Sequence, residues 1–124
     1  MRRKIVAGNW KMNKTFQEAE ELIAEIADKL ESMDTSSQDV IICPPYVYLE
    51  MATDIAEESV FRVGAQNINE NDIGAYTGEI SGSMLSSMEV EYCIIGHSER
   101  RKYYKEINIV LARKIDAAIK NGIR

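Results

Sequence analysis

The sequence predicts an α/β fold in which four parallel strands alternate with helices. Short apolar runs without polar alternation recur along the chain, as in strands buried on both faces. Segments with apolar residues at helical spacing lie between them. Because a helix between two strands of one sheet implies a right-handed crossover, the sheet is expected to be parallel. The 124 residues predict one domain, residues 1–124, with about 31 residues in each strand-helix unit.

The first two units show this pattern most clearly. Thr15, with Glu18 three residues later, predicts a capping box at the start of the first helix. Two prolines, Pro44 and Pro45, end the second apolar run. The predicted elements of these units are the strands 5–7 and 40–43 and the helices 16–30 and 49–56.

The third and fourth units are less regular. Ser98 predicts the cap of a short helical turn, and Gly122 is typical of the position just beyond a helix end. The connection after the third strand is about a dozen residues long, and loops of that length are often functional. The predicted elements are the strands 61–65 and 92–95, an irregular segment 66–77, and helices at 84–88, 98–103 and 108–119.

Composition excludes several classes of function. The formal charge of -5 argues against nucleic-acid binding, because such proteins generally carry a basic patch. Residues 1–4 are basic, but the apolar run behind them is too short for a secretion signal or a membrane span, so we expect a cytoplasmic protein. Cys43 and Cys93 are 50 positions apart and are expected to be buried free thiols. With a single histidine and no paired cysteines, no metal site is expected.

Polar residues follow the predicted strands. In parallel α/β sheets, ligands bind beyond the carboxyl ends of the strands, so Asn9, Lys11 and His97 are expected at one rim. A lysine can bind phosphate or a developing oxyanion, an asparagine donates through its amide, and a histidine can donate a proton near neutrality. Each of these residues alone could be a solvated or structural residue. Because three of them are expected at one rim, a ligand-binding site is favoured. Arg100 and Arg101 fit either phosphate binding or surface and interface pairing.

A phosphate-binding P-loop is the rival interpretation of residues 8–15. The segment follows a strand, opens a helix and differs from that motif at the second glycine, where Asn13 could adopt a left-handed backbone. A nucleotide triphosphatase also needs an aspartate at another strand end to hold magnesium. The other strands end without one. The P-loop therefore ranks far second.

Four segments together resemble the triosephosphate isomerase family. They occur in order along the chain, and the first and last are the most specific: 7–13 (AGNWKMN), 64–67 (GAQN), 74–79 (GAYTGE) and 95–101 (IGHSERR). The resemblance implies the N-terminal half, about (βα)4, of a TIM (βα)8 barrel. It also implies an isomerase of glycolysis and gluconeogenesis that interconverts dihydroxyacetone phosphate and glyceraldehyde 3-phosphate through an enediolate, with no cofactor or metal.

The resemblance also implies residue roles. Asn9 and Lys11 resemble the substrate-binding pair, with Lys11 offsetting the charge of phosphate and enediolate, and His97 resembles the electrophile. Glu99 resembles the residue that holds the lysine; Lys11, His97 and Glu99 are thus the expected catalytic residues. The family is homodimeric, and the expected interface residues are Thr77 and Glu79 of the loop that inserts into the partner subunit, and Arg100, which meets that loop.

Length is the main departure from the family. A (βα)8 barrel takes about 250 residues, and the family's base, a glutamate after strand six, has no counterpart in these 124 residues. We therefore expect the isolated chain, a fragment, to be inactive or nearly so. The alternative is a non-catalytic half-barrel that self-associates through the edges of its first and fourth strands.

Overall fold

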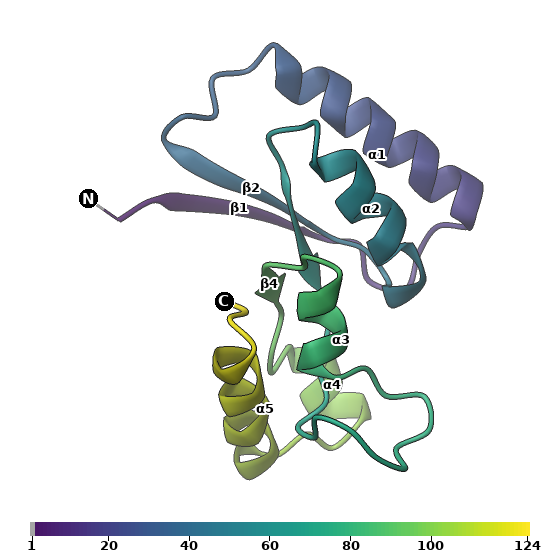
Figure 1. Cartoon of the computed structure of the whole chain (residues 1–124), viewed down its shortest axis with the longest axis vertical. Helices are drawn as coiled ribbons and strands as arrows, with labels where there is room; N and C mark the ends of the chain where they lie inside the picture. Colours follow the sequence, from purple (N-terminus) through teal and green to yellow (C-terminus); the bar gives the residue numbers. More distant parts are fainter. Residues whose placement is uncertain (1) are drawn as a thin grey trace.

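The four predicted strands pair side by side in chain order (Figure 1). The computed structural model describes residues 2–124, and all three strand pairings in it are parallel. The strands are β1 (Lys4–Asn9), β2 (Gln38–Cys43), β3 (Arg62–Ala65) and β4 (Tyr92–Cys93). The helices are α1 (Phe16–Glu31), η1 (Tyr46–Tyr48), α2 (Leu49–Ala56), α3 (Gly82–Ser87), α4 (Ser98–Tyr103) and α5 (Asn108–Lys120). The predicted α/β fold with four parallel strands is confirmed.

The strand register brings the carboxyl ends to one rim. Asn9 pairs with Cys43, and Ala65 pairs with Cys93, so the loops that follow the strands begin close together. The sheet is curled, with α1 and α2 beside β1 and β2 (Figure 1). Parallel pairing with helical crossovers therefore delivers the predicted polar residues to a common edge.

The main core lies between the sheet and the helices. The largest fully buried side chains in it are Ile23 of α1, Leu49 of α2, Leu85 of α3 and Ile68 of the loop after β3. A smaller cluster of Ile41, Cys43 and Tyr92 lies apart from this core. Phe16 is apolar and has helical spacing with the core residues of α1, but it is 60% exposed and meets Tyr48 edge-on, because it begins α1 beyond the reach of the core.

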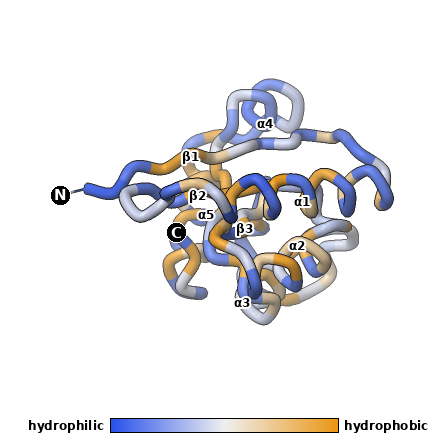
Figure 2. The backbone as a smooth tube through the Cα atoms, turned by 90° about the horizontal axis from the view of Figure 1, so that it is seen from above, coloured by the Kyte–Doolittle hydropathy of each residue, from blue (hydrophilic) through white to orange (hydrophobic). Residues whose placement is uncertain are grey.

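The prediction that every strand is buried on both faces is wrong for β1. Ile5 and Val6 are each 57% exposed, because β1 has a neighbour on one side only. Figure 2 shows hydrophobic colour in β1 as well as in the helices. An exposed apolar edge strand is a recognised site for association.

The opposite edge of the sheet is already occupied. Arg124 donates its main-chain N–H to Glu91 O and accepts from the N–H of Cys93, each at 2.9 Å. Ile123 is buried. Arg124 therefore lies hydrogen-bonded along the outer edge of β4, and the expectation that this edge is unpaired is wrong at Cys93.

Two of the predicted helix caps differ in detail. The Thr15 hydroxyl donates to the Glu18 carboxylate at 3.0 Å and caps no backbone N–H. His97, not Ser98, is the N-cap of α4. Gly122 follows α5 with a φ of +71°, which confirms its predicted role, since glycine adopts this backbone without a steric penalty. Within residues 2–124, no helix has the length and apolar character needed to cross a membrane.

Candidate active site

A cavity of about 300 Å³ lies at the carboxyl rim of the sheet and brings the predicted residues together. Asn9 is the last residue of β1, Lys11 follows it by two positions, and His97 precedes α4. All three line the cavity, as do Glu99 and Arg100. Residues that follow two different strands, β1 and β4, thus converge on one space, as the parallel topology predicts.

The backbone of Lys11 is left-handed, with a φ of +57°. The side-chain oxygen of Asn9 accepts a hydrogen bond from the Lys11 N–H at 2.9 Å, which ties the two residues together. Asn13, the residue expected to be left-handed in a P-loop, instead donates to the Trp10 carbonyl at 2.7 Å. The loop therefore uses its polar groups to shape the turn at Lys11, which disfavours the P-loop interpretation.

Lys11 and Glu99 form an ion pair across the rim. Lys11 Nζ donates to Glu99 Oε1 at 2.5 Å, and both side chains are about half exposed, at 52% and 43%. The hydrogen bond from Lys11 holds the pKa of the Glu99 carboxyl below its ordinary value, and the positive charge of Lys11 acts in the same direction. The ammonium is thus anchored but still open to solvent and to a ligand.

The ring of His97 is oriented by the first turn of α4. Its Nδ1 accepts a hydrogen bond from the main-chain N–H of Glu99 at 3.1 Å, so Nδ1 carries no proton. The Glu99 carboxylate is 3.7 Å from the same nitrogen, too far for a hydrogen bond. A neutral His97 therefore carries its proton on Nε2 and can donate it.

A buried polar network behind the rim was not predicted from the sequence. Lys114 Nζ donates to Glu106 Oε2 at 2.6 Å and to Asn67 Oδ1 at 2.7 Å, and Arg100 Nε donates to the same Glu106 oxygen at 2.6 Å. Lys114 and Glu106 are only 4% and 8% exposed. One signal was available: Lys114 lies on the apolar stripe of its helix, three residues after Leu111.

Burial raises the pKa of the Glu106 carboxyl, but hydrogen bonds from Lys114 and Arg100, together with their charges, outweigh it, so the net pKa is lowered. Oε1 of the same carboxylate has no hydrogen-bond partner, and neither has the hydroxyl of Tyr46, a residue of the rim cavity that the sequence did not single out. The local sequence around Glu106 and Tyr46 does not predict that either side chain is placed with a polar atom buried.

Of the predicted interface residues, Thr77 and Glu79 lie away from the rim cavity, whereas Arg100 lines it. Thr77 is exposed in the loop between β3 and α3 and does not line the rim cavity. The Glu79 carboxylate accepts from Asn69 at 3.0 Å within that loop. Arg100 is held by Glu106 and lies over the ring of Tyr104, 4.7 Å from its centroid. Arg101 donates to Asn108 at 2.9 Å, so it is a surface-pairing residue here.

Both cysteines are free thiols. Burial raises the pKa of Cys43 to about 11 and that of Cys93 to about 12, which keeps both protonated near neutrality. Cys43 is buried as predicted, whereas Cys93 is partly exposed. Across residues 2–124, no group of three or more histidine, cysteine, aspartate or glutamate side chains is arranged to hold a metal ion.

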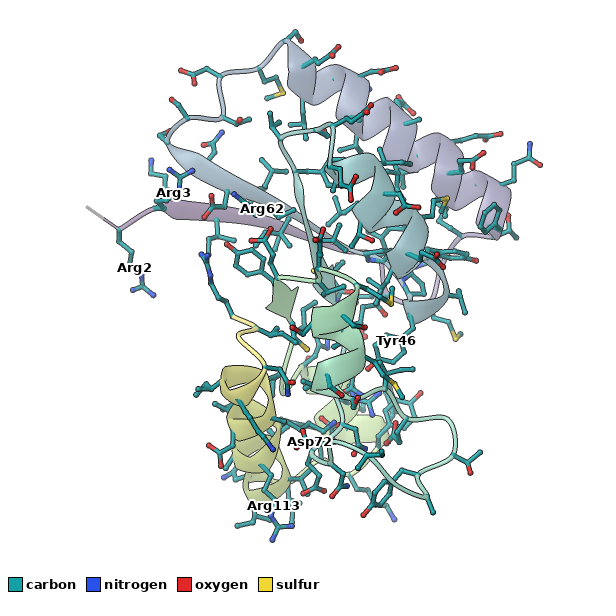
Figure 3. All side chains as sticks on the ribbon, in the orientation of Figure 1. Arg2, Arg3, Tyr46, Arg62, Asp72 and Arg113 are labelled. Carbon is teal, nitrogen blue, oxygen red and sulfur yellow. The ribbon has the colours of Figure 1, made fainter. Side chains whose placement is uncertain are left out.

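A larger cavity of about 500 Å³ lies at the other end of the strands. Four of its charged residues are already paired: Arg3 with Asp39 at 2.9 Å, and Arg62 with Glu91 at 2.6 Å. Arg3 and Arg62 are labelled near the start of β1 in Figure 3, far from Asp72 and Arg113. No predicted site residue lines this cavity, so we place the candidate site at the rim.

A family model described as triosephosphate isomerase matches residues 4–124. The chain belongs to the triosephosphate isomerase family. The match covers all four strand-helix units and every residue of the candidate site.

Similar triosephosphate isomerases come from several bacteria. That of Shewanella halifaxensis (strain HAW-EB4) is 46% identical over 130 residues, which cover 99% of this chain and 49% of the relative. That of Shewanella piezotolerans is 45% identical with the same coverage. The crystal structure of triosephosphate isomerase from Bartonella henselae superposes with a TM-score of 0.89 at 36% identity, covering 98% of this chain and 49% of that one.

The chain spans about half the length of the curated relatives it matches. Its curled sheet of four parallel strands corresponds to the N-terminal half of a TIM barrel. The predicted family and the predicted half-barrel are therefore both confirmed.

Proposed function

We propose that this protein takes part in triose-phosphate isomerisation, the interconversion of dihydroxyacetone phosphate and glyceraldehyde 3-phosphate through an enediolate. In this proposal, residues 1–124 supply the asparagine, lysine and histidine part of the site. The observation that carries it is the convergence of Asn9, Lys11 and His97 on one rim cavity, with Lys11 paired to Glu99. The reaction is one of glycolysis and gluconeogenesis, and we propose a cytoplasmic location.

Each side chain has a chemical task that matches its geometry. Lys11 and Asn9 bind the substrate, and the ammonium offsets the negative charge of phosphate and of the developing enediolate. His97 donates from Nε2 to the substrate carbonyl oxygen, because its Nδ1 is committed to the N–H of Glu99. Hydrogen-bond donors fixed before the reaction stabilise such charge without reorganising during it.

Glu99 acts as the partner that holds Lys11 between turnovers. Because the pair is half exposed, an incoming anion can share the ammonium with the carboxylate. The carboxylate is occupied by Lys11, so we do not assign it the task of removing the carbon-bound proton. By the family resemblance that base is a glutamate after strand six, outside residues 1–124. The proposal involves no cofactor and no metal.

The proposed partner is a second copy of the family's subunit. Thr77 and Glu79 are exposed on the loop between β3 and α3, as a docking loop requires. Arg100 lines the rim cavity, where the loop of a partner would arrive. We propose these three as interface residues of a homodimer.

A coupled assay of isomerisation tests the proposal. The 124-residue chain alone should be inactive or nearly so, because proton abstraction needs a positioned base. Addition of a second polypeptide carrying the other four strand-helix units of a relative should restore activity. The Lys11→Ala variant should abolish the restored activity, which excludes a contaminating enzyme. Restored activity that is indifferent to Lys11→Ala would contradict the proposal, as would full turnover by the chain alone that depends on Glu99.

A non-catalytic, self-associating half-barrel is the second candidate function. The exposure of Ile5 and Val6 on the edge strand β1 favours it. If β1 carries the association, Val6→Pro should abolish the oligomer in sedimentation while Thr77→Ala leaves it intact. The opposite result would favour the loop-mediated dimer, and a stable soluble monomer at high concentration would refute both arrangements.

A further inference from the structure

The side chain of Gln66 joins the loops that follow the first three strands. Gln66 comes directly after β3, and its Nε2 donates to the carbonyl of Lys11 at 2.8 Å and to that of Cys43, the last residue of β2, at 2.9 Å. A glutamine amide has two N–H donors. Both are used here, and both partners are main-chain oxygens.

The Lys11 end of this link is conformationally strained. A non-glycine residue at a φ of +57° is disfavoured by about 1 kcal/mol or more and persists only where its surroundings hold it. Asn9 holds the N–H of Lys11, and Gln66 holds its carbonyl. The two side chains therefore bind the two main-chain polar groups of the same residue. That residue is the lysine whose ammonium contacts Glu99.

The next residue, Asn67, makes its contact elsewhere. Its Oδ1 accepts from Lys114 in the buried network, so consecutive side chains after β3 serve different regions. Gln66 is only partly buried, and both of its amide hydrogen bonds go to main-chain carbonyls of neighbouring segments. The pattern is that of a side chain that fixes main-chain geometry.

We propose that Gln66 is a positioning residue for Lys11. Its carboxamide holds the Lys11 main chain in the left-handed conformation that directs the ammonium to Glu99 and the rim cavity. The functional part of this inference rests on the proposed role of Lys11 as the anion anchor.

The test compares Gln66→Met with Gln17→Met in the isotope-labelled 124-residue chain. Methionine matches glutamine in length but cannot donate, and Gln17 donates only to Glu21 on the exposed surface of α1. The readouts are the Cα chemical shift and amide-to-α coupling of Lys11, which report φ, and a titration with inorganic phosphate. We expect Gln66→Met to move Lys11 out of the left-handed region and to weaken phosphate binding about threefold to tenfold. Gln17→Met should change neither.

Two results would overturn the inference. One is a Lys11 signal in Gln66→Met that is unchanged from the parent chain; the other is weaker phosphate binding without any change at Lys11. Should Gln66→Met fail to fold, nuclear Overhauser contacts between the Gln66 amide protons and Lys11 in the unsubstituted chain decide the matter, since their absence contradicts the link. Failure of the unsubstituted chain to bind phosphate would refute the proposed role of Lys11 as anion anchor. The φ of Lys11 in Gln66→Met would then still decide whether Gln66 holds the Lys11 main chain.

Discussion

Two neighbouring residues of α4, Glu99 and Arg100, take part in two different lysine–glutamate pairs, one exposed and one buried. Glu99 pairs with Lys11 at the rim, and Arg100 joins the Glu106–Lys114 pair behind it. The two lysine–glutamate distances are nearly equal, 2.5 and 2.6 Å. Exposure differs greatly, since both rim side chains are about half exposed whereas the inner pair is about 5% exposed. Distance alone therefore says little about what a pair does.

Burial decides the energetic role of each pair. Water screens the rim pair, so its loss should disturb the fold little, and its ammonium is free to meet an anion. The inner pair has been removed from water, so each charge depends on the other. The inner network also connects Asn67 at the end of β3 with α4 and α5. We infer that the rim pair serves binding and the inner pair serves the fold.

The largest expected effect comes from breaking the inner pair. Lys114→Met leaves Glu106 buried with only Arg100 as partner, and removal of one member of a buried pair typically destabilises a protein by about 3 to 5 kcal/mol. We expect a loss of about 3 kcal/mol in the free energy of unfolding, measured with urea. Lys11→Met is the matched control at the rim and should have a much smaller effect.

The double variant Lys114→Met/Glu106→Met sharpens the same comparison. Replacing both members of a buried pair by apolar groups of similar size is often nearly neutral, because neither member is left without its partner. Arg100 also loses its contact with Glu106, but its side chain is 29% exposed and can be hydrated. The double variant should therefore recover most of the stability lost in Lys114→Met. Equal losses in Lys114→Met and Lys11→Met would contradict the assignment of the inner pair to the fold.

The rim could be predicted from the sequence because its signals are local. Apolar runs fix where strands end, and parallel topology brings the residues after them to one edge. Asn9, Lys11 and His97 were expected there and share one cavity. The inner network could not be predicted as a unit, because Asn67, Glu106 and Lys114 meet through packing between distant segments. A lysine on an apolar helix stripe marked only Lys114.

Exposure and backbone strain were also beyond the sequence. The apolar run of β1 has the composition of a buried strand, and only the position at the edge of the sheet leaves Ile5 and Val6 exposed. The rival P-loop interpretation allowed a left-handed backbone at Asn13, but Lys11 and Lys14 adopt it in this loop. At Lys11 the main-chain N–H donates to the Asn9 side-chain oxygen and the carbonyl accepts from Gln66, and local propensity predicts neither contact.

Acid should act mainly through the inner pair. The folded-state pKa of Glu106 lies below its ordinary value, so the folded state holds its proton less tightly than the unfolded state. The stability it contributes is therefore present above the unfolded pKa, about 4.3, and is lost as pH falls through the folded pKa. When urea unfolding of the unsubstituted chain is measured from pH 7 to pH 3, the urea concentration at the midpoint should therefore fall at the acid end of this range.

The double variant Lys114→Met/Glu106→Met should show a shallower acid loss than the unsubstituted chain. The pKa of Glu99 is lowered as well, so its contribution has the same sign, but its exposure makes that contribution small. Glu99→Gln should thus leave the acid profile nearly as steep as before. A profile flattened by Glu99→Gln and unaffected by the double variant would reverse our ranking of the two pairs.

The smallest expected effect on stability is the difference between two substitutions at Lys11, glycine and alanine. Glycine adopts a φ of +57° without the steric penalty that alanine meets. Both Lys11→Gly and Lys11→Ala remove the ion pair with Glu99, so the difference between them isolates the backbone. We expect Lys11→Gly to be more stable than Lys11→Ala by about 0.5 to 1 kcal/mol, after allowance for the greater entropy of an unfolded glycine. Equal stability of the two variants would show that the left-handed conformation at Lys11 carries no strain.

The same two variants test the anion anchor. The chemical shift changes that phosphate induces at Asn9 and His97 should disappear in both variants. Retained phosphate shifts would show that the ammonium is not the anion anchor, and the rim pair would then lose the role that distinguishes it from the inner one.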